Sequence, residues 1–415
     1  MTALSDLIAR NRAGAVCGLP SWCTAQPETL AAILQTYRDD TAPVLIEATC
    51  NQVNQFGGYT GMTPAAFRAF VEAIAAAQGV DPARLILGGD HLGPNPWKSK
   101  PAGQAMDQAR VMVAAYVAAG FTKIHLDASM PCADDRVLPD HIMADRAADL
   151  CAVAEAAAGG RKLSYVIGTE VPVPGGETAP LDSLAVTTPQ ATRHTLDLHR
   201  AAFAARGLND AFGRVIALVV QPGVDFGNDQ IFAFDPVRAS TLADAAPSLG
   251  GPLYEAHSTD YQSQPALRAL VAGHFAILKV GPELTFAFRQ AVTALAHLEL
   301  ALDVAEPSNL LTVLAQAMND DPADWRDYVA PGPREAAMRL YGLADRVRYY
   351  WPRPAVRRAL DQLFANIRTA TPEPGLVAQF TGGLVAPFDP ARLPEAVIAQ
   401  MIGQVVAKYR NATGA

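Results

Sequence analysis

Histidine and carboxylate residues follow several short apolar runs of this 415-residue chain. Asp90 and His91 come just after the apolar run 85–87, and His257 follows the run 252–256. In α/β proteins the carboxyl ends of buried strands are where catalytic and ligand-binding side chains gather. Imidazole nitrogens combined with carboxylate oxygens are typical ligands of divalent transition metals. The spacing therefore predicts a metal centre, provided that the fold brings these strand ends together.

The residue types also indicate a chemistry. His91, Glu170 and His257 are the candidate metal ligands, and a Zn, Mn, Ni or Co ion held there would polarise a sugar carbonyl and stabilise an enediolate. Asp90, Asp127 and Glu170 are the candidate acid–base residues. An electrophile paired with a base is what retro-aldol cleavage or epimerisation of a ketose needs. Any single histidine here is more often a hydrogen-bonded structural residue, so the hypothesis rests on the number of polar residues gathered.

Other polar residues are predicted to line the same pocket and to bind the hydroxyl groups or the phosphate of a ketohexose. They are Glu47, Asn51, Asn54, His125, Gln221, Ser258, Asp260 and Lys279. The amides of 51–55 suit sugar hydroxyls, with a self-bonded loop as the equal alternative. Lys279 could form a Schiff base, but an ion pair with a carboxylate such as Glu47 is favoured. Ser258, Thr259 and the Gly281 amide lie where barrels often hold phosphate.

The elements that must position these residues alternate between strand and helix. Apolar runs predict strands, each followed by a helix, at 15–18, 43–48, 85–89, 123–127, 163–168, 214–220, 252–256 and 276–281. Eight parallel βα units in about 300 residues predict an α/β fold of the TIM (β/α)8 barrel type, in which all strand ends face one mouth. A doubly wound sheet is the alternative, but the chain has neither GxGxxG nor GxxxxGK[ST].

The pattern changes near residue 305. We predict a barrel over 1–305 and a helical extension over 306–415, packed on the barrel or on a partner, with helices at 334–347 and 354–367. Aromatic and arginine residues cluster in this extension. The aromatic residues are more typical of a core. The arginines are more typical of a solvated or ion-paired face than of a phosphate site.

Composition bounds the remaining possibilities. The formal net charge is -8 with interspersed signs, which argues against nucleic acid or an anionic membrane as the main partner. The five cysteines are odd in number and form no CxxC pair, which argues against a disulfide framework or a structural zinc. No uncharged apolar run reaches about 18 residues, so we expect a soluble, cytoplasmic protein.

Several stretches of the chain are long enough to be specific: PVLIEATCNQVNQFGGYTGMTP at 43–64, GFTKIHLDASM at 120–130, VVQPGVDF at 219–226, YEAHSTDYQ at 254–262 and RYYWP at 348–352. Together they resemble the GatZ/KbaZ family, the Z-type subunits of class II D-tagatose-1,6-bisphosphate aldolase. The resemblance implies a metal-dependent aldolase type of barrel and a place in galactitol, N-acetylgalactosamine or tagatose catabolism. Z-type subunits are usually described as non-catalytic partners of a catalytic aldolase subunit. Other relatives are associated with metal-dependent C4 epimerisation of ketohexoses.

The resemblance also implies roles for single residues. Asp90 and His91 match the base and first metal ligand of the catalytic class II pattern, and His257 matches a second ligand. Gln221 stands where the catalytic enzymes have a histidine, and 258–260 replaces their glycine-rich phosphate loop, which argues against bisphosphate cleavage. We expect a Z-type, metal-binding barrel that acts on a ketohexose or its phosphate and forms a homo-oligomer. A stand-alone ketohexose 4-epimerase and a non-catalytic stabilising subunit are the alternatives.

Overall fold

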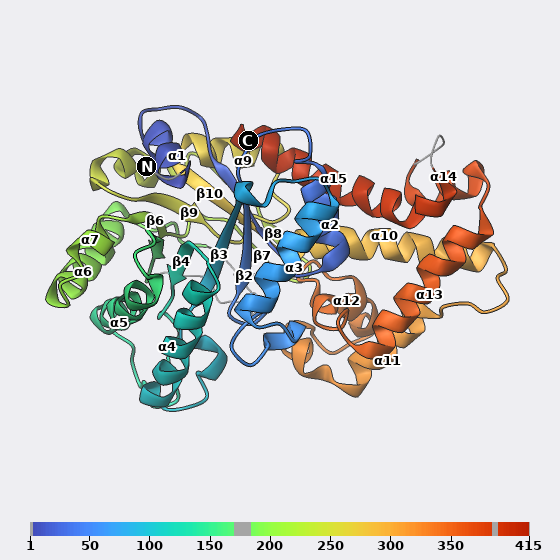
Figure 1. The fold of residues 1–415 in the computed structure, drawn as a ribbon, viewed down its shortest axis with the longest axis horizontal. Coiled ribbons are helices and arrows are strands. Elements are labelled where there is room, and N and C mark those ends of the chain that lie inside the picture. Colours follow the sequence, from blue (N-terminus) through green and yellow to red (C-terminus); the bar gives the residue numbers. More distant parts are fainter. Residues whose placement is uncertain (1–2, 170–183, 384–388, 415) are drawn as a thin grey trace.

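The computed structural model describes residues 3–169, 184–383 and 389–414. Its centre is a closed barrel of parallel strands in the order β1-β10-β9-β6-β5-β4-β3-β2. The strands are β1 (Leu19–Cys23), β2 (Val44–Thr49), β3 (Leu85–Leu92), β4 (Lys123–Leu126), β5 (Ser164–Ile167), β6 (Val215–Val219), β9 (Leu253–Ala256) and β10 (Phe275–Val280). The predicted TIM barrel is confirmed (Figure 1).

The first strand was predicted too early, at 15–18. The structure places β1 at Leu19–Cys23, where Leu19 pairs with β10 and Ser21 pairs with β2. Pro20 lies inside this strand and has no amide hydrogen, which argues against a strand when only the sequence is read. The run 15–18 instead makes a turn, in which Cys17 donates its amide to the carbonyl of Ala15.

Helices cover the outside of the barrel: α1 (Ala3–Arg12), α2 (Pro27–Gln35), α3 (Pro64–Ala77), α4 (Ala102–Ala118), α5 (Asp140–Ala158), α6 (Pro189–Ala205), α7 (Asn209–Phe212), α8 (Ser240–Ala245), α9 (Gln264–Ala272) and α10 (Pro282–Ala301). Thr63 caps α3 through the amide of Ala66, as its sequence predicts. A small antiparallel pair, β7 (Asp225–Phe226) with β8 (Ile231–Phe232), was not predicted. It lies outside the barrel sheet.

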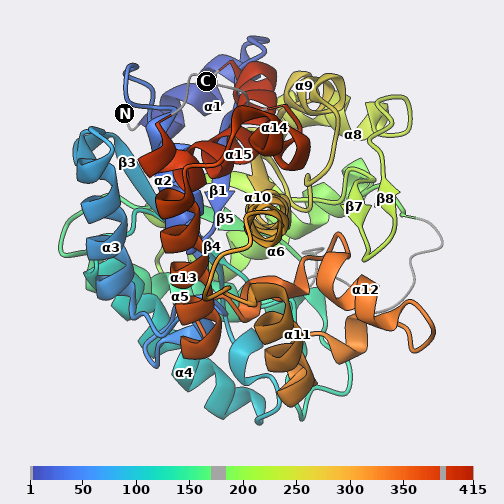
Figure 2. The same cartoon turned by 90° about the vertical axis from the view of Figure 1, so that its right-hand side faces the viewer.

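The chain after the barrel is helical: α11 (Leu310–Asp320), α12 (Glu335–Tyr341), α13 (Pro354–Ala370), α14 (Pro374–Thr381) and α15 (Leu393–Thr413). Figures 1 and 2 show α11, α12 and α13 beside the barrel, whereas α15 runs back along α10 and packs on α2 and α9. The helix predicted at 334–347 is too long. The chain leaves α12 at Gly342, where the Asn228 side chain donates to the carbonyl oxygen of Met338 and the Asn228 backbone oxygen accepts from the amide of Leu343. A short 3-10 turn, η7 (Arg346–Tyr349), follows.

Strand β3 has an irregularity that sets the site. Its register with β4 shifts between Gly89 and Leu92, and His91 has a positive φ of 50°. Consecutive residues of a regular strand point to opposite faces, but a bulge re-aims a side chain. As a result, Asp90 and His91 both line the cavity at the barrel mouth.

The glycines of the motif Gly88–Gly93 leave room for this arrangement. A Cβ atom at Gly88 would lie 2.3 Å from Glu47 Oε1, and one at Gly93 would lie 1.6 Å from the backbone oxygen of Asp127. The second contact involves backbone, which a neighbouring side chain cannot relieve by changing rotamer. Gly93 therefore fixes how closely the loop after β3 approaches the end of β4.

We expect Gly93→Ala to lower the free energy of unfolding by about 3 kcal/mol or more, because β4 must shift to admit the methyl group. Urea unfolding followed by circular dichroism measures the effect. Gly103→Ala is the matched control: Gly103 lies in α4 with nothing within 4 Å of the added Cβ. That change should be neutral or stabilise by up to about 1 kcal/mol. Equal stability of the two variants would contradict the role assigned to Gly93.

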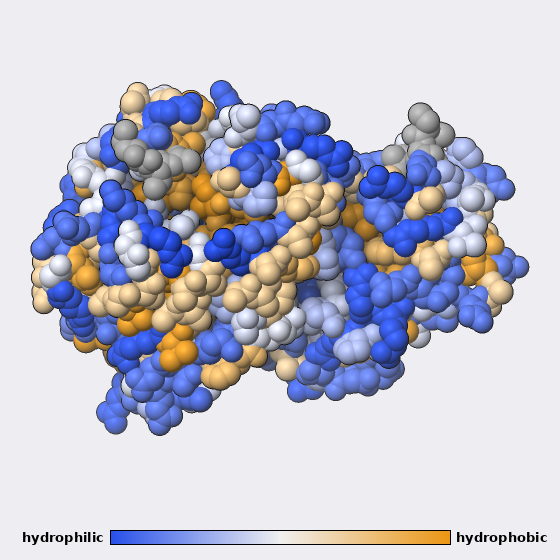
Figure 3. Space-filling model, viewed as in Figure 1, coloured by the Kyte–Doolittle hydropathy of each residue, from blue (hydrophilic) through white to orange (hydrophobic). Residues whose placement is uncertain are grey.

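Hydrophilic residues cover most of the face shown in Figure 3, with hydrophobic residues in patches between them. Within residues 3–169, 184–383 and 389–414, none of the helices combines the length and the apolar character needed to cross a membrane.

Candidate metal centre

Three histidines from different parts of the barrel meet at its mouth. His91 comes from β3, His125 from β4, and His257 lies directly after β9. Their ring centroids are 5.1 Å apart for His91 and His125, 5.0 Å for His91 and His257, and 5.2 Å for His125 and His257. All three side chains are buried. The three rings therefore lie close together at the mouth. The ligand atoms that converge on one another belong to Asp90, His125, Glu255 and His257, and the predicted ligand His91 is not among them.

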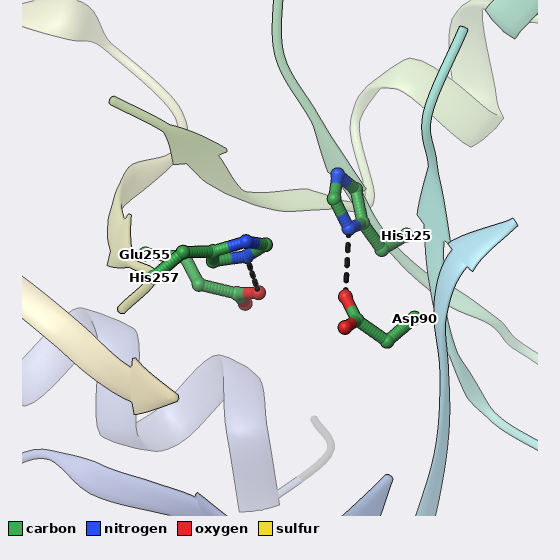
Figure 4. A group of neighbouring side chains, drawn as sticks. All are labelled: Asp90, His125, Glu255 and His257. Atoms are coloured by element: carbon green, nitrogen blue, oxygen red, sulfur yellow. Dashed lines mark hydrogen bonds and ion pairs between the residues drawn. The ribbon is translucent and has the colours of Figure 1, made fainter. Parts of the chain in front are cut away.

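Each ring has one nitrogen within hydrogen-bonding distance of a buried carboxylate: His91 Nδ1 with Asp127 at 2.8 Å, His125 Nδ1 with Asp90 at 2.9 Å, and His257 Nε2 with Glu255 at 2.9 Å. We call these the carboxylate–histidine pairs; Figure 4 shows the second and the third. In metal sites such a carboxylate fixes the orientation of the ring and leaves the other nitrogen for the metal. One of those nitrogens, His125 Nε2, is buried without a hydrogen-bond partner in the described part of the chain.

Two of the carboxylates are also close enough to bind an ion directly. One ligand atom from each of Asp90, His125, Glu255 and His257 lies within 4.8 Å of the other three (Figure 4). The donor set of nitrogen and oxygen atoms suits a divalent transition metal. Glu170, a predicted ligand and acid–base residue, lies outside the described residues.

Two buried lysines connect the carboxylates behind the histidines. Lys123 Nζ lies 2.6 Å from Glu47 and 2.8 Å from Glu255. Lys279 Nζ lies 2.5 Å from Glu47 and 2.8 Å from Asp90, so the pairing with Glu47 that the sequence favoured is present. Burial would lower the pKa of Lys279, but Asp90 and Glu47 outweigh it and hold the pKa well above its usual value. A charged Lys279 is a poor Schiff-base nucleophile.

The charges of this cluster do not balance. Among the residues that the structure describes, four buried carboxylates, Glu47, Asp90, Asp127 and Glu255, face two ammonium groups, those of Lys123 and Lys279. An excess of negative charge is costly inside a protein, where water cannot solvate it. A divalent cation would supply the missing positive charge, so both the donor types and the charge of the cluster fit such an ion.

The two histidines predicted as ligands differ electrostatically. Burial would lower the pKa of His91, but the carboxylates of Asp90 and Asp127 outweigh it and raise the pKa. For His257 burial wins over the attraction of Glu255, and the pKa falls to about 4. His257 is therefore neutral at physiological pH, which is the form that binds metal. In the absence of an ion, a proton on His91 offsets part of the negative charge.

A cavity of about 790 Å³, including its open mouth, lies over this cluster. The predicted site residues that line it are Asn51, Asp90, His91, His257, Ser258, Asp260 and Lys279. The side chains of Glu47, His125 and Asp127 are buried next to this lining, within hydrogen-bonding or ion-pair distance of it.

Two residues predicted to bind substrate instead form hydrogen bonds with the backbone of their own loops. Asn54 Oδ1 accepts hydrogen bonds from the amides of Phe56 and Gly58, which is the self-bonded alternative. Gln221 Oε1 accepts hydrogen bonds from the amides of Gly223 and Val224. Neither residue lines the cavity.

The sequence analysis missed several residues of the site. Glu255 could have been predicted as a site residue, because it shares a strand face with His257 two positions later. Tyr59, Arg348 and Tyr349 also line the cavity. The last two come from η7, in the extension, about 90 residues after the barrel motifs, so no spacing rule links them to the histidines.

A closed parallel barrel with a histidine–carboxylate cluster at its mouth defines the class: a TIM-barrel protein with a site suited to a divalent metal. The family model described as "D-tagatose-1,6-bisphosphate aldolase subunit GatZ/KbaZ-like" matches residues 4–414. The chain belongs to this GatZ/KbaZ-like family, as the sequence motifs predicted.

Individual relatives show how similar the chain is to named proteins. It is 47% identical to the D-tagatose-1,6-bisphosphate aldolase subunit GatZ of Klebsiella pneumoniae, over 98% of both chains. It is 48% identical to the D-tagatose 6-phosphate 4-epimerase of Agrobacterium fabrum, over 100% of this chain and 99% of that protein. A crystal structure described as a probable tagatose 6 phosphate kinase from Sinorhizobium meliloti 1021 has a TM-score of 0.86 and 44% identity, and the match covers 95% of this chain and 100% of that one.

Proposed function

We propose that the chain is a Z-type subunit of the tagatose-bisphosphate aldolase type which binds a ketohexose phosphate at a divalent metal and catalyses aldol-type chemistry on it. The observation that carries this proposal is the set of three neighbouring carboxylate–histidine pairs beside an open cavity at the barrel mouth. A scaffold protein would gain nothing from so many buried ionisable groups, since each is costly to desolvate.

In this proposal His91, His125 and His257 hold the ion, with Glu170 as the further predicted ligand. The ion, Zn, Mn, Ni or Co, would act as a Lewis acid for the sugar carbonyl. Asp90 is the residue placed to accept a proton from the substrate, because it lines the cavity. Burial would raise the pKa of Asp90, but His91 and Lys279 outweigh it and hold the pKa well below its usual value, so the carboxylate is ionised. Asp127 lies behind His91 and orients that ring.

A stand-alone 4-epimerase is the second candidate, and the near-complete match to a relative named D-tagatose 6-phosphate 4-epimerase favours it. Epimerisation at C4 can proceed by breaking and re-forming the C3–C4 bond, so the same metal and base would serve both reactions. We do not propose phosphoryl transfer from a nucleotide, because the sequence carries no nucleotide-binding loop.

The test is an assay of the purified chain with D-tagatose 6-phosphate, D-fructose 6-phosphate and the two 1,6-bisphosphates, with added metal or excess chelator. NMR identifies a 4-epimer, and a coupled assay detects triose phosphates. We expect metal-dependent turnover of at least one ketohexose phosphate. Full activity in excess chelator would reject the metal. No turnover by the chain alone, together with stabilisation of an added catalytic class II aldolase subunit, would establish the non-catalytic role instead.

A further inference from the structure

The place where many barrels bind phosphate is already filled by the chain itself. That place is the amino end of the helix after the last strand, here α10, whose first free amides attract anions. Asp260 Oδ1 accepts hydrogen bonds from the amides of Gly281, at 3.0 Å, and Glu283, at 2.8 Å. Pro282, between them, has no amide hydrogen. The amides that a phosphate would need are therefore bound to a carboxylate.

The groups around the amino end of α10 also make this position unfavourable for an anion. The hydroxyl of Thr259 donates to the carbonyl oxygen of Lys279 at 2.5 Å and so is engaged within the fold. Glu283 adds a second carboxylate, which accepts a hydrogen bond from the amide of Tyr261 at 2.8 Å. A phosphate dianion at this position would meet two buried acidic side chains, of which Glu283 is already paired with Lys408. The amides and the cation nearest to this position are thus engaged by the protein's own carboxylates.

A cationic group lines the same cavity from another direction. Arg348 and Tyr349 belong to η7, in the extension, and both line the cavity together with the histidines His91 and His257. Arg348 also lines a second cavity, of about 660 Å³, which no histidine lines, together with Tyr59 and Thr285. Arg348 thus lies on the border between the cavity that the histidines line and a neighbouring cavity.

The guanidinium of Arg348 is held in place. Nη1 donates to the carbonyl oxygens of Ala344 and, at 3.1 Å, of Asp345, and Nη2 donates to the hydroxyl of Tyr349, also at 3.1 Å. The group lies 4.6 Å from the centre of the Tyr349 ring, and Arg346 lies 4.5 Å from the same centre. Two cations next to one phenol create a positive region, and a fixed guanidinium matches the geometry of phosphate oxygens.

We propose that Arg348, with the Tyr349 hydroxyl beside it, binds the phosphate group of the substrate where the cavity borders the second cavity. The inference rests on the proposed function for the identity of the sugar. It assigns the anion-binding task to the C-terminal extension, in place of the amino end of α10. It also explains how a chain of net charge -8 can hold a phosphorylated ligand, since the positive charge is local.

The experiment is titration calorimetry of the metal-loaded full chain with D-fructose 6-phosphate, D-tagatose 6-phosphate, the two unphosphorylated sugars and inorganic phosphate. Arg348→Gln should raise the Kd for both sugar phosphates by about 10- to 100-fold and abolish measurable binding of inorganic phosphate. The Kd for the unphosphorylated sugars should change by less than about threefold, because their hydroxyl groups do not need the charge. Arg348→Lys keeps the charge without the planar fork, so its loss should be smaller.

Arg353→Gln is the matched control. Arg353 lies five residues further on, pairs with Asp321 at 2.7 Å and does not line the cavity, so the same loss of charge should leave every Kd unchanged. Bound metal and the melting temperature report whether each variant folds. Equal binding of the sugar phosphates by wild type and Arg348→Gln would overturn the inference, as would an equal loss for phosphorylated and plain sugars in a folded variant. If the wild type bound none of these ligands, the proposed function itself would be overturned, and the inference with it.

Discussion

The variant His257→Ala is expected to lose its metal and, with it, turnover of the ketohexose phosphate by about 1,000-fold or more. His257 is neutral at physiological pH and one of three neighbouring rings, so its removal takes away a ligand that no other described residue replaces. Metal content by mass spectrometry and the assay above measure the two effects.

A matched variant separates this result from a general effect of losing a histidine. His194→Ala removes an exposed imidazole on α6, whose contact with Asp140 is a distant 3.9 Å, and should leave both metal content and turnover unchanged. Normal metal content in folded His257→Ala would remove His257 from the ligand set.

Asp127→Asn should give a milder loss, about 10- to 100-fold in metal affinity, because Asp127 orients the His91 ring and is not itself one of the proposed ligands.

The second large effect is on stability. Lys123→Met should lower the free energy of unfolding by about 3–5 kcal/mol, because Glu47 and Glu255 would lose a buried partner that lies within 2.8 Å of both. Burial would lower the pKa of Lys123, but Glu255 and Glu47 outweigh it and raise the pKa, so the lysine is charged in the folded state. Denaturant unfolding of metal-free protein measures the loss.

Two further variants test the cause of that loss. Lys162→Met removes an exposed lysine at the opposite end of the barrel strands and should change stability by less than about 0.5 kcal/mol. Adding Glu47→Gln to Lys123→Met removes one of the two carboxylates that lose Lys123 and should recover part of the stability, although Glu47 keeps Lys279 as a partner. A double variant less stable than the sum of the two single changes would contradict a loss caused by unpaired charge.

Much of the fold could be predicted because strands and helices are local patterns. The apolar runs after residue 40 each became a barrel strand, and the alternation with helices was enough to predict closure. Two failures have physical causes. Pro20 hides β1, since proline is unusual inside a strand. The end of α12 is hydrogen-bonded at Met338 and Leu343 by Asn228, which lies more than 100 residues earlier and so leaves no local pattern in the sequence.

The site was predictable where it lies on strand ends and unpredictable where it lies elsewhere. His91, His257 and Lys279 could be placed at one mouth because barrel geometry brings strand ends together. Arg348 could not, because its position depends on how the extension packs against the barrel. The partners of Asn54 and Gln221 were equally hidden: a polar side chain near a site can as well bind the backbone of its own loop.

The last helix reaches the site as well. The hydroxyl of Tyr409, near the end of α15, donates at 2.7 Å to the backbone oxygen of Thr259, in the loop beside His257. During synthesis, residue 409 emerges from the ribosome more than 100 residues after the last barrel strand, β10. A nascent chain can therefore pair all its strands while this loop still lacks its support, so the site should become fully ordered only after α15 has emerged, and a chain truncated shortly before residue 409 should form a barrel with an unsupported mouth.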